Sequence, residues 1–222
     1  MMDTSHPACR EFVFERTEMV DLQIRDRGIS TPAVLHAMRT IPRHLFVPPE
    51  LAQSAYEDYP LPIGYGQTIS QPYIVALMTD LLNLSGKEKV LEVGSGSGYQ
   101  TAILAELARE VISVEIEGRL VAAASERLAA LGLGNASIME MDGSGGFEGE
   151  APFDRILVTA GAPRVPEKLL EQLNPGGRMV LPVGDRVSQA LQIWKKDADG
   201  HPSCEKHISV IFVPLRGEYG WN

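Results

Sequence analysis

The chain has 222 residues and a formal net charge of −9, and it is 44% hydrophobic and 22% charged. This length suits one α/β domain with an extension and a sizeable buried core. The acidic balance disfavours a nucleic-acid substrate, because binding to phosphate backbones depends on clustered positive charge. No apolar run approaches the roughly 18 residues of a membrane span, so we expect no membrane association.

The N-terminal residues and the cysteines indicate the expected compartment. Residues 1–10 are polar and lack the apolar stretch of a signal peptide. The two cysteines, Cys9 and Cys204, are far apart in the sequence and fit no metal-binding or redox spacing. We therefore expect a cytoplasmic protein that binds no metal ion.

Helices and a long loop are predicted for the first third of the chain. Residues 11–27 are expected to be helical. Ser30-Thr31-Pro32 offers a cap and a first-turn proline for a second helix, which Pro42 ends. Residues 43–70 are rich in proline and glycine and should be mostly loop. A third helix follows, with apolar residues at helical spacing from Ile74 to Leu82.

Strands and helices alternate from residue 89 onward. The pattern predicts strands at 89–93, 111–115, 136–141, 155–159 and 178–183, with helices at 99–109, 119–131 and 166–173. This rhythm is typical of a doubly wound α/β fold, with a mostly parallel sheet covered on both faces. Residues 190–195 and 208–215 have no helix between them and predict an antiparallel hairpin.

We therefore expect one domain in three parts: an N-terminal helical and loop extension (1–72), a Rossmann-like cofactor-binding core (73–184) and a C-terminal β-hairpin and tail (185–222).

A glycine-rich loop, Gly94-Ser95-Gly96-Ser97-Gly98, follows the first predicted strand of the core. Ligands of doubly wound sheets bind beyond the carboxyl ends of the strands, where this loop should lie. A dinucleotide-binding loop would need a small residue at position 99, which is Tyr99, and no lysine follows as in a phosphate-binding loop. The pattern fits the class I methyltransferase motif, so Gly94, Ser95, Gly96 and Gly98 are predicted to bind S-adenosylmethionine.

Three acidic residues near the ends of successive strands support this cofactor. Glu92 is placed to receive the methionine ammonium, directly or through water. Glu115 can accept the ribose hydroxyls. Asp142 and Gly143 close the third strand, where this fold reads the adenine amino group. Each acid alone is better explained as a turn or strand-end residue, whereas the three together favour a cofactor site.

The segment Gly66-Gln67-Thr68-Ile69-Ser70-Gln71-Pro72 carries the most specific resemblance. Together with the glycine loop and the 154–163 segment, it resembles the protein-L-isoaspartate O-methyltransferase family over about residues 19–216. The resemblance implies an enzyme that methylates the free α-carboxylate of L-isoaspartyl residues in damaged proteins and peptides. The ester then closes to a succinimide, which begins repair. It also implies a monomer.

The same resemblance implies roles for individual residues. Ser70 matches the active-site serine of the family, and its neighbours Thr68, Ile69 and Gln71 match residues of the cofactor pocket. The local sequence alone is equally compatible with Ser70 as a helix N-cap. Two segments, 182–183 and 210–214, match backbone that holds the peptide substrate. Family C-termini vary after Leu215, which leaves a contact between this tail and the cofactor open.

Three alternatives remain at this point. A methyltransferase of another substrate class would share every cofactor motif, although the sequence has no Asp/Asn-Pro-Pro-Tyr box and no Pro-Cys nucleophile. A nicotinamide-dependent dehydrogenase is disfavoured by Tyr99. A binding module without activity is disfavoured by the presence of Ser70, Glu92, Glu115 and Asp142 together.

Overall fold

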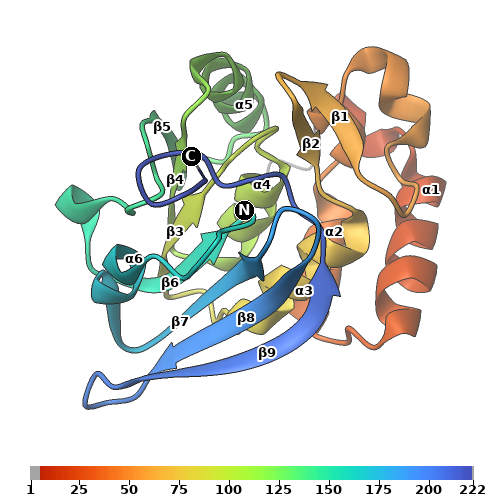
Figure 1. Cartoon of the computed structure of the whole chain (residues 1–222). Helices are drawn as coiled ribbons and strands as arrows, with labels where there is room; N and C mark the ends of the chain where they lie inside the picture. The colour runs from red at the N-terminus through yellow and green to blue at the C-terminus, as the bar shows by residue number, and fades with distance from the viewer. Residues whose placement is uncertain (1–5, 222) are drawn as a thin grey trace.

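A seven-stranded sheet in the order β5-β4-β3-β6-β7-β8-β9 forms the centre of the computed structural model, which describes residues 6–221 (Figure 1). The strands β5, β4, β3, β6 and β7 are parallel to one another, and β8 and β9 add an antiparallel edge. The predicted sheet and hairpin are therefore confirmed. The strands are β3 (Lys89–Val93), β4 (Glu110–Glu115), β5 (Ala136–Glu140), β6 (Phe153–Val158), β7 (Leu173–Gly184), β8 (Gln189–Lys196) and β9 (Pro202–Val210).

The helices lie within a few residues of the predicted ranges. They are α1 (Val13–Glu18), α2 (Pro32–Thr40), α3 (Pro72–Leu82), α4 (Tyr99–Leu107), α5 (Gly118–Ala130) and α6 (Glu167–Glu171). A π-helical segment and a 3-10 turn extend α1 to Arg27, so the expected helical run over 11–27 is largely confirmed. Among the described residues, no helix has the length and apolar character needed to cross a bilayer.

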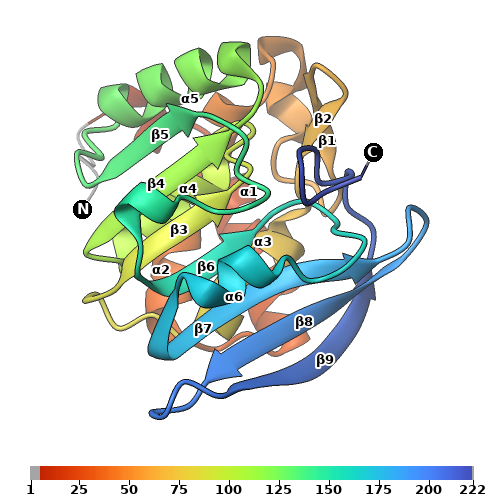
Figure 2. The ribbon, with the colours of Figure 1, turned by 60° about the vertical axis from the view of Figure 1, so that its left-hand side comes forward.

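Both faces of the sheet are covered by apolar packing, as the strand pattern predicts. Successive residues of a strand point to opposite faces. Val90 and Leu157 accordingly join one hydrophobic cluster, which includes side chains of α2, α3, α4 and α5. Their neighbours Leu91 and Ile156 join a second cluster, which includes Leu169 of α6. Helix α6 lies on this other face of the sheet (Figure 2). The N-terminal extension shares the first cluster, so it is part of the same core.

The prediction of a mostly irregular segment at 43–70 is wrong in one important part. Residues 61–69 form a β-hairpin, β1 (Leu61–Gly64) and β2 (Gln67–Ile69), separate from the main sheet. Tyr65 and Gly66 turn the chain with positive φ angles of 55° and 72°, as the tightest hairpins require. Pro62 is tolerated because a two-stranded ribbon leaves one edge of each strand unpaired. Two short 3-10 helices, η4 (Arg43–Phe46) and η5 (Pro49–Ser54), precede the hairpin.

The last strand is also displaced from its predicted range of 208–215. Strand β9 covers Pro202–Val210, and most of its side chains are exposed to solvent. A strand exposed on both faces has no apolar alternation, so the sequence pattern could not mark it. The apolar residues that follow leave the sheet edge. Ile211 is 79% exposed, and Pro214 pairs with Gly161.

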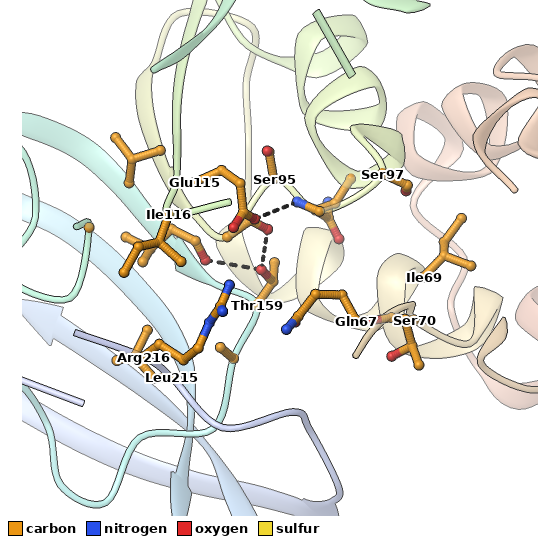
Figure 3. A pocket seen from close by; sticks show the side chains of 18 of the residues that line it. Gln67, Ile69, Ser70, Ser95, Ser97, Glu115, Ile116, Thr159, Leu215 and Arg216 are labelled. Carbon is orange, nitrogen blue, oxygen red and sulfur yellow. Dashed lines mark hydrogen bonds between the residues drawn. The ribbon is translucent and has the colours of Figure 1, made fainter. Parts of the chain in front are cut away.

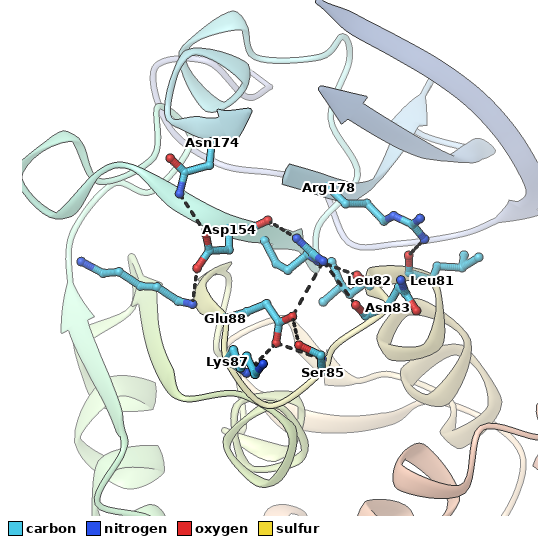
Figure 4. A network of polar contacts seen from close by, with 11 residues as sticks. Leu81, Leu82, Asn83, Ser85, Lys87, Glu88, Asp154, Asn174 and Arg178 are labelled. Atoms are coloured by element: carbon cyan, nitrogen blue, oxygen red, sulfur yellow. Dashed lines mark hydrogen bonds and ion pairs between the residues drawn. The ribbon is translucent and has the colours of Figure 1, made fainter. Parts of the chain in front are cut away.

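A polar network at the amino ends of β3 and β6 fixes the end of α3 (Figure 4). Arg155 of β6 and Arg178 of β7 donate to the carbonyls of Leu82 and Leu81, at 2.7 Å each. The last carbonyls of a helix have no partner within it, so these arginines satisfy them. Glu88 accepts hydrogen bonds from Ser85 and from the Lys87 amide, and lies 3.8 Å from Arg155. The network therefore anchors the helix whose other end lies at the site described below.

We predict that Glu88→Gln destabilises the fold mainly at neutral pH. Burial would raise the pKa of Glu88, but the hydrogen bonds from Ser85 and the Lys87 amide outweigh it and hold the pKa below its usual value. A carboxyl with a lowered folded-state pKa stabilises the fold above its unfolded pKa, and this contribution is lost as the pH falls. We expect a loss of about 1–2 kcal/mol in the free energy of unfolding at neutral pH. The loss should shrink below about pH 4.3.

Urea unfolding of both proteins across this pH range measures the effect. Glu110→Gln is the matched control, because that carboxylate is half exposed and its ion pair with Arg109 is 3.9 Å long. An equal loss at acid and neutral pH would show that the charge of Glu88 does not matter.

Candidate active site

A cavity opens at the carboxyl ends of β3, β4 and β6, where the sequence predicts the cofactor (Figure 3). Its walls come from the β1-β2 hairpin, the glycine loop, the ends of three strands and the C-terminal tail. The predicted site residues Thr68, Ile69, Ser70, Gly94, Ser95, Gly96, Glu115 and Gly143 all line it, together with Gln67, Val114, Ile116, Ser144, Thr159, Leu215 and Arg216. Segments that are far apart in the sequence therefore meet at one edge of the sheet.

The glycine loop is shaped by close contacts that exclude larger residues. Gly94 has a φ of 96°, and a Cβ there would lie 2.6 Å from the Thr159 hydroxyl. Its amide donates to the Val114 carbonyl at 2.8 Å. Gly98 has a φ of 87° and would bring a Cβ within 3.0 Å of Ala124 on α5. Gly94 thus shapes the cavity wall, whereas Gly98 serves the packing of α4 against α5 behind it.

Glu115 connects the glycine loop to the end of β4. One carboxylate oxygen accepts the Gly96 amide and the other accepts the Glu117 amide, each at 3.0 Å. The side chain is buried yet lines the cavity. Each carboxylate oxygen can accept more than one hydrogen bond, so Glu115 keeps acceptor capacity for a ligand hydroxyl.

Glu92 lies behind the cavity wall and is fully buried. One oxygen accepts the hydroxyls of Thr101 and Ser113 at 2.5 and 2.6 Å. The other oxygen has no hydrogen-bond partner among the described residues. Burial raises the pKa of Glu92 to about 7, and the nearby charge of Glu115 adds to the effect of burial, while the two hydroxyls partly offset it. A buried, unpartnered oxygen fits the predicted approach of an ammonium group, directly or through water.

Asp142 is held by the C-terminal tail next to the cavity. Its oxygens accept the amides of Ser144 and Glu218, at 2.9 and 2.8 Å. Burial would raise the pKa of Asp142, but these amide hydrogen bonds outweigh it and keep the pKa low. Gly143 and Ser144, which follow it, line the cavity itself. A Cβ at Gly143 would collide with the Val114 side chain, so only glycine fits there.

A second cavity adjoins the first on the side of the hairpin. Thr68, Ser70 and Thr159 line both cavities, and Gln71 lines the second. Residues 209–213 form its outer wall. The other segment predicted to hold a peptide, Pro182–Val183, is not free to do so, because Ala162 already pairs with this backbone.

Ser70 stands where the two cavities meet, between β2 and α3. Helix α3 has Gln71 at its N-cap, with no hydrogen bond from a capping side chain. The Ser70 hydroxyl forms no hydrogen bond with any described residue, and the side chain is half-buried. Of the two roles that the local sequence allows, the helix cap is therefore excluded. The hydroxyl remains available to a ligand.

Several residues that line the cavity were not predicted from the sequence, and Thr159 and Arg216 are two polar examples. Thr159 directly follows β6, and its hydroxyl is 2.5 Å from the Gly94 carbonyl and 3.0 Å from that of Val93. Arg216 belongs to the tail, which Trp221 fixes by donating to the Gly161 carbonyl at 2.9 Å. Thr159 could have been found from the rule that parallel strands share a carboxyl edge. Arg216 had no such signal, because its place depends on tertiary contacts of the tail.

Comparison with known proteins agrees with this geometry. The family model for protein-L-isoaspartate(D-aspartate) O-methyltransferases matches residues 15–220. The chain belongs to this family. The match extends slightly beyond the resemblance seen in the sequence and includes the C-terminal tail up to Gly220.

Relatives of the family match nearly the whole chain. A protein-L-isoaspartate O-methyltransferase of Trichlorobacter lovleyi is 55% identical, covering 95% of this chain and 97% of its own. One of Methanoregula boonei is 52% identical, covering 93% and 95%. A beta-aspartate methyltransferase from Plasmodium falciparum, solved in complex with S-adenosyl-L-homocysteine, is 26% identical, with a TM-score of 0.79 over 90% of this chain and 98% of its own. The Rossmann-like methyltransferase fold is confirmed.

We predict that Glu92→Gln removes a pH-dependent loss of stability in the ligand-free protein. Because the pKa of Glu92 is raised to about 7, the folded state holds its proton more tightly than the unfolded state. The wild-type free energy of unfolding should therefore fall as the pH rises from about 4.3 to about 7. The amide side chain of the variant cannot ionise. The stability of the variant relative to wild type should rise over this interval and level off above it.

Urea unfolding at several pH values in this interval provides the measurement. The exposed Glu126 provides a matched control, because Glu126→Gln should not alter the pH dependence. Parallel curves for wild type and the Glu92 variant would show that Glu92 does not change its protonation on folding.

Proposed function

We propose that this protein transfers the methyl group of S-adenosylmethionine to the free α-carboxylate of L-isoaspartyl residues in damaged proteins and peptides. Closure of the ester to a succinimide then starts repair. Family membership supports the reaction class. The observation that carries the proposal is the meeting of two cavities at Ser70, whose hydroxyl is free. One cavity suits the methyl donor, and the other suits a peptide.

The residues of the first cavity fit S-adenosylmethionine, which supplies an electrophilic methyl group on its sulfonium. In this proposal Glu115 accepts the ribose hydroxyls, and Gly143 and Ser144 lie beside the adenine. The unpartnered oxygen of Glu92 receives the ammonium group, directly or through a water molecule. Gly94, Ser95 and Gly96 let the ligand approach the backbone without a side chain in the way.

The second cavity places the acceptor carboxylate. An α-carboxyl group has a pKa of about 3.5, so it is ionised at neutral pH and needs no general base. The enzyme must instead orient one oxygen toward the methyl group and exclude water. The Ser70 hydroxyl can donate to the oxygen that does not attack. Val210, Phe212 and Val213 supply an apolar wall on the far side.

The substrate class is tested with two peptides that differ only in one linkage. We expect methyl transfer from labelled S-adenosylmethionine to a peptide containing L-isoaspartate and none to the same peptide with L-aspartate. The two isomers have the same atoms and charge, so only geometry can separate them. A misplacement of about 1 Å costs roughly a hundredfold in rate, which makes strong selectivity reasonable. Methylation of both peptides at similar rates would refute the proposed substrate.

We predict that Ser70→Ala lowers the kcat for the isoaspartyl peptide by about ten- to a hundredfold. This range corresponds to one hydrogen bond to a charged group. Because Ser70 caps no helix, the free energy of unfolding should change by less than about 0.5 kcal/mol. Steady-state kinetics and urea unfolding measure the two effects on the same samples.

Ser137→Ala on the exposed side of β5 is the matched control and should change neither quantity. A Ser70 variant with a wild-type kcat would remove Ser70 from the reaction. It would leave the peptide result unaffected.

A further inference from the structure

Arg43 is a buried cation close to the proposed active site. It belongs to η4 and is 0% exposed. Within the described residues it has no ion-pair partner, and burial lowers its pKa to about 10, so it stays charged at neutral pH. Burying a charge without a counter-ion is unfavourable, and apolar residues often replace buried ions without loss of stability. A role in packing alone therefore does not account for arginine here.

The Arg43 guanidinium joins three segments of the N-terminal extension. Its Nε donates to the Ala55 carbonyl and its Nη2 to the Ser70 carbonyl, each at 2.7 Å. The group also lies 4.9 Å from the centre of the Tyr99 ring. One planar guanidinium thus connects η4 to the residues that directly follow η5 and β2. Tyr99 begins α4 immediately after the glycine loop and lines the first cavity, so Arg43 lies behind a wall residue of that cavity without lining it.

The hydrogen bond from Arg43 is made to the backbone carbonyl of Ser70, the residue proposed to orient the substrate carboxylate. The Ser70 hydroxyl has no hydrogen bond of its own to any described residue, so the backbone of Ser70 is the part of this residue that a hydrogen bond holds in place. A guanidinium is planar and donates in fixed directions, whereas a lysine ammonium is a point charge on a flexible stem. Arginine can therefore hold the Ala55 and Ser70 carbonyls in fixed directions that a lysine ammonium does not define.

We propose that Arg43 is a positioning residue for methyl transfer, holding the Ser70 backbone so that its hydroxyl stands where the two cavities meet. The proposal rests on the proposed function of Ser70. It assigns to Arg43 no contact with the substrate or the methyl donor. Its effect on the reaction passes through Ser70.

A double-mutant cycle on kcat tests this dependence. The proteins are wild type, Arg43→Lys, Ser70→Ala and the double variant, assayed with the isoaspartyl peptide and S-adenosylmethionine. We expect Arg43→Lys to lower kcat about tenfold in the wild-type background and by less than about twofold in the Ser70→Ala background. The Kd for S-adenosylmethionine should stay within about twofold, because Arg43 does not line the cavity. An unchanged kcat, or an equal loss in both backgrounds, would overturn the proposal.

A second buried arginine provides the matched control. Arg16 is 5% exposed and donates to the Cys9 and Glu11 carbonyls, but it has no bond to Ser70. Arg16→Lys should lower the melting temperature and leave kcat within about twofold of wild type. A tenfold loss of kcat from both lysine variants would mean that any loosened buried arginine impairs the enzyme, and would overturn the proposal.

The test remains decisive if Arg43→Lys does not fold. Arg43→Met keeps the length of the side chain without a buried charge, and it enters the same cycle with the same expected outcomes. The failure of Ser70 itself is distinguishable, because Ser70→Ala alone would then retain the wild-type kcat. In that case Arg43 has no catalytic serine to position, and the proposal falls with it. The isoaspartyl selectivity of the enzyme would still stand.

Discussion

The parallel pairing of β3 with β4 and β6 is the constraint on which the site depends. In this register Val93 lies beside Val114 on one side and Val158 on the other. The next residue of each strand, Gly94, Glu115 and Thr159, therefore comes out at the same edge. The Gly94 amide bonds to the Val114 carbonyl, and the Thr159 amide bonds to the Val93 carbonyl at 3.0 Å. Backbone geometry alone thus brings the loop, the acid and the threonine together.

Two further parts of the cavity wall come from outside the main sheet and its helices. The hairpin supplies Gln67 to Ser70, and the tail supplies Pro214 to Arg216. A glycine loop with strand-end acids can serve many methyltransferases, so it cannot select a substrate. The second cavity is lined mostly by Thr68 and Ser70 before α3, by Gln71 and Ile74 at the start of α3, and by the 209–213 segment. Substrate choice is therefore expected to reside in the extensions, which are also the most specific part of the sequence.

The sequence predicted well the elements whose signals are local. Strand β3 was predicted to the residue, because a strand buried on both faces reads as an uninterrupted apolar run. The β1-β2 hairpin was missed because Pro62 and the glycines Gly64 and Gly66 indicate a loop when read without the partner strand. Strand β9 was misplaced because its polar residues carry no alternation, whereas the apolar residues after it do not belong to the sheet.

The site residues likewise could be predicted only where the sequence carries a local signal. Most of the predicted residues line one of the two cavities, because motif and strand order together locate a carboxyl edge. The free hydroxyl of Ser70 could not be predicted, since a serine just before a helix has an equally good local use as a cap. Which of the two holds depends on where the helix begins. Here it begins one residue later, with Gln71 at the N-cap, and the chain direction at Ser70 follows from a hydrogen bond to Arg43, 27 residues earlier in the chain.

Two fully buried ionisable side chains, Arg43 and Glu92, lack an ion-pair partner among the described residues. Burial of each charged group is unfavourable for folding. Desolvation lowers the pKa of Arg43 and raises that of Glu92, which in both cases favours the neutral form. Neutral hydrogen-bond partners, backbone carbonyls for Arg43 and hydroxyls for Glu92, compensate part of this cost. Buried polar and charged residues concentrate at functional sites, where they lower the stability of the fold but fix the positions of functional groups. Arg43 bonds to Ser70, which lines the first cavity, and Glu92 directly precedes Val93 and Gly94, which also line it. Both buried charges therefore lie next to the place where a carboxyl methyltransferase most needs fixed geometry.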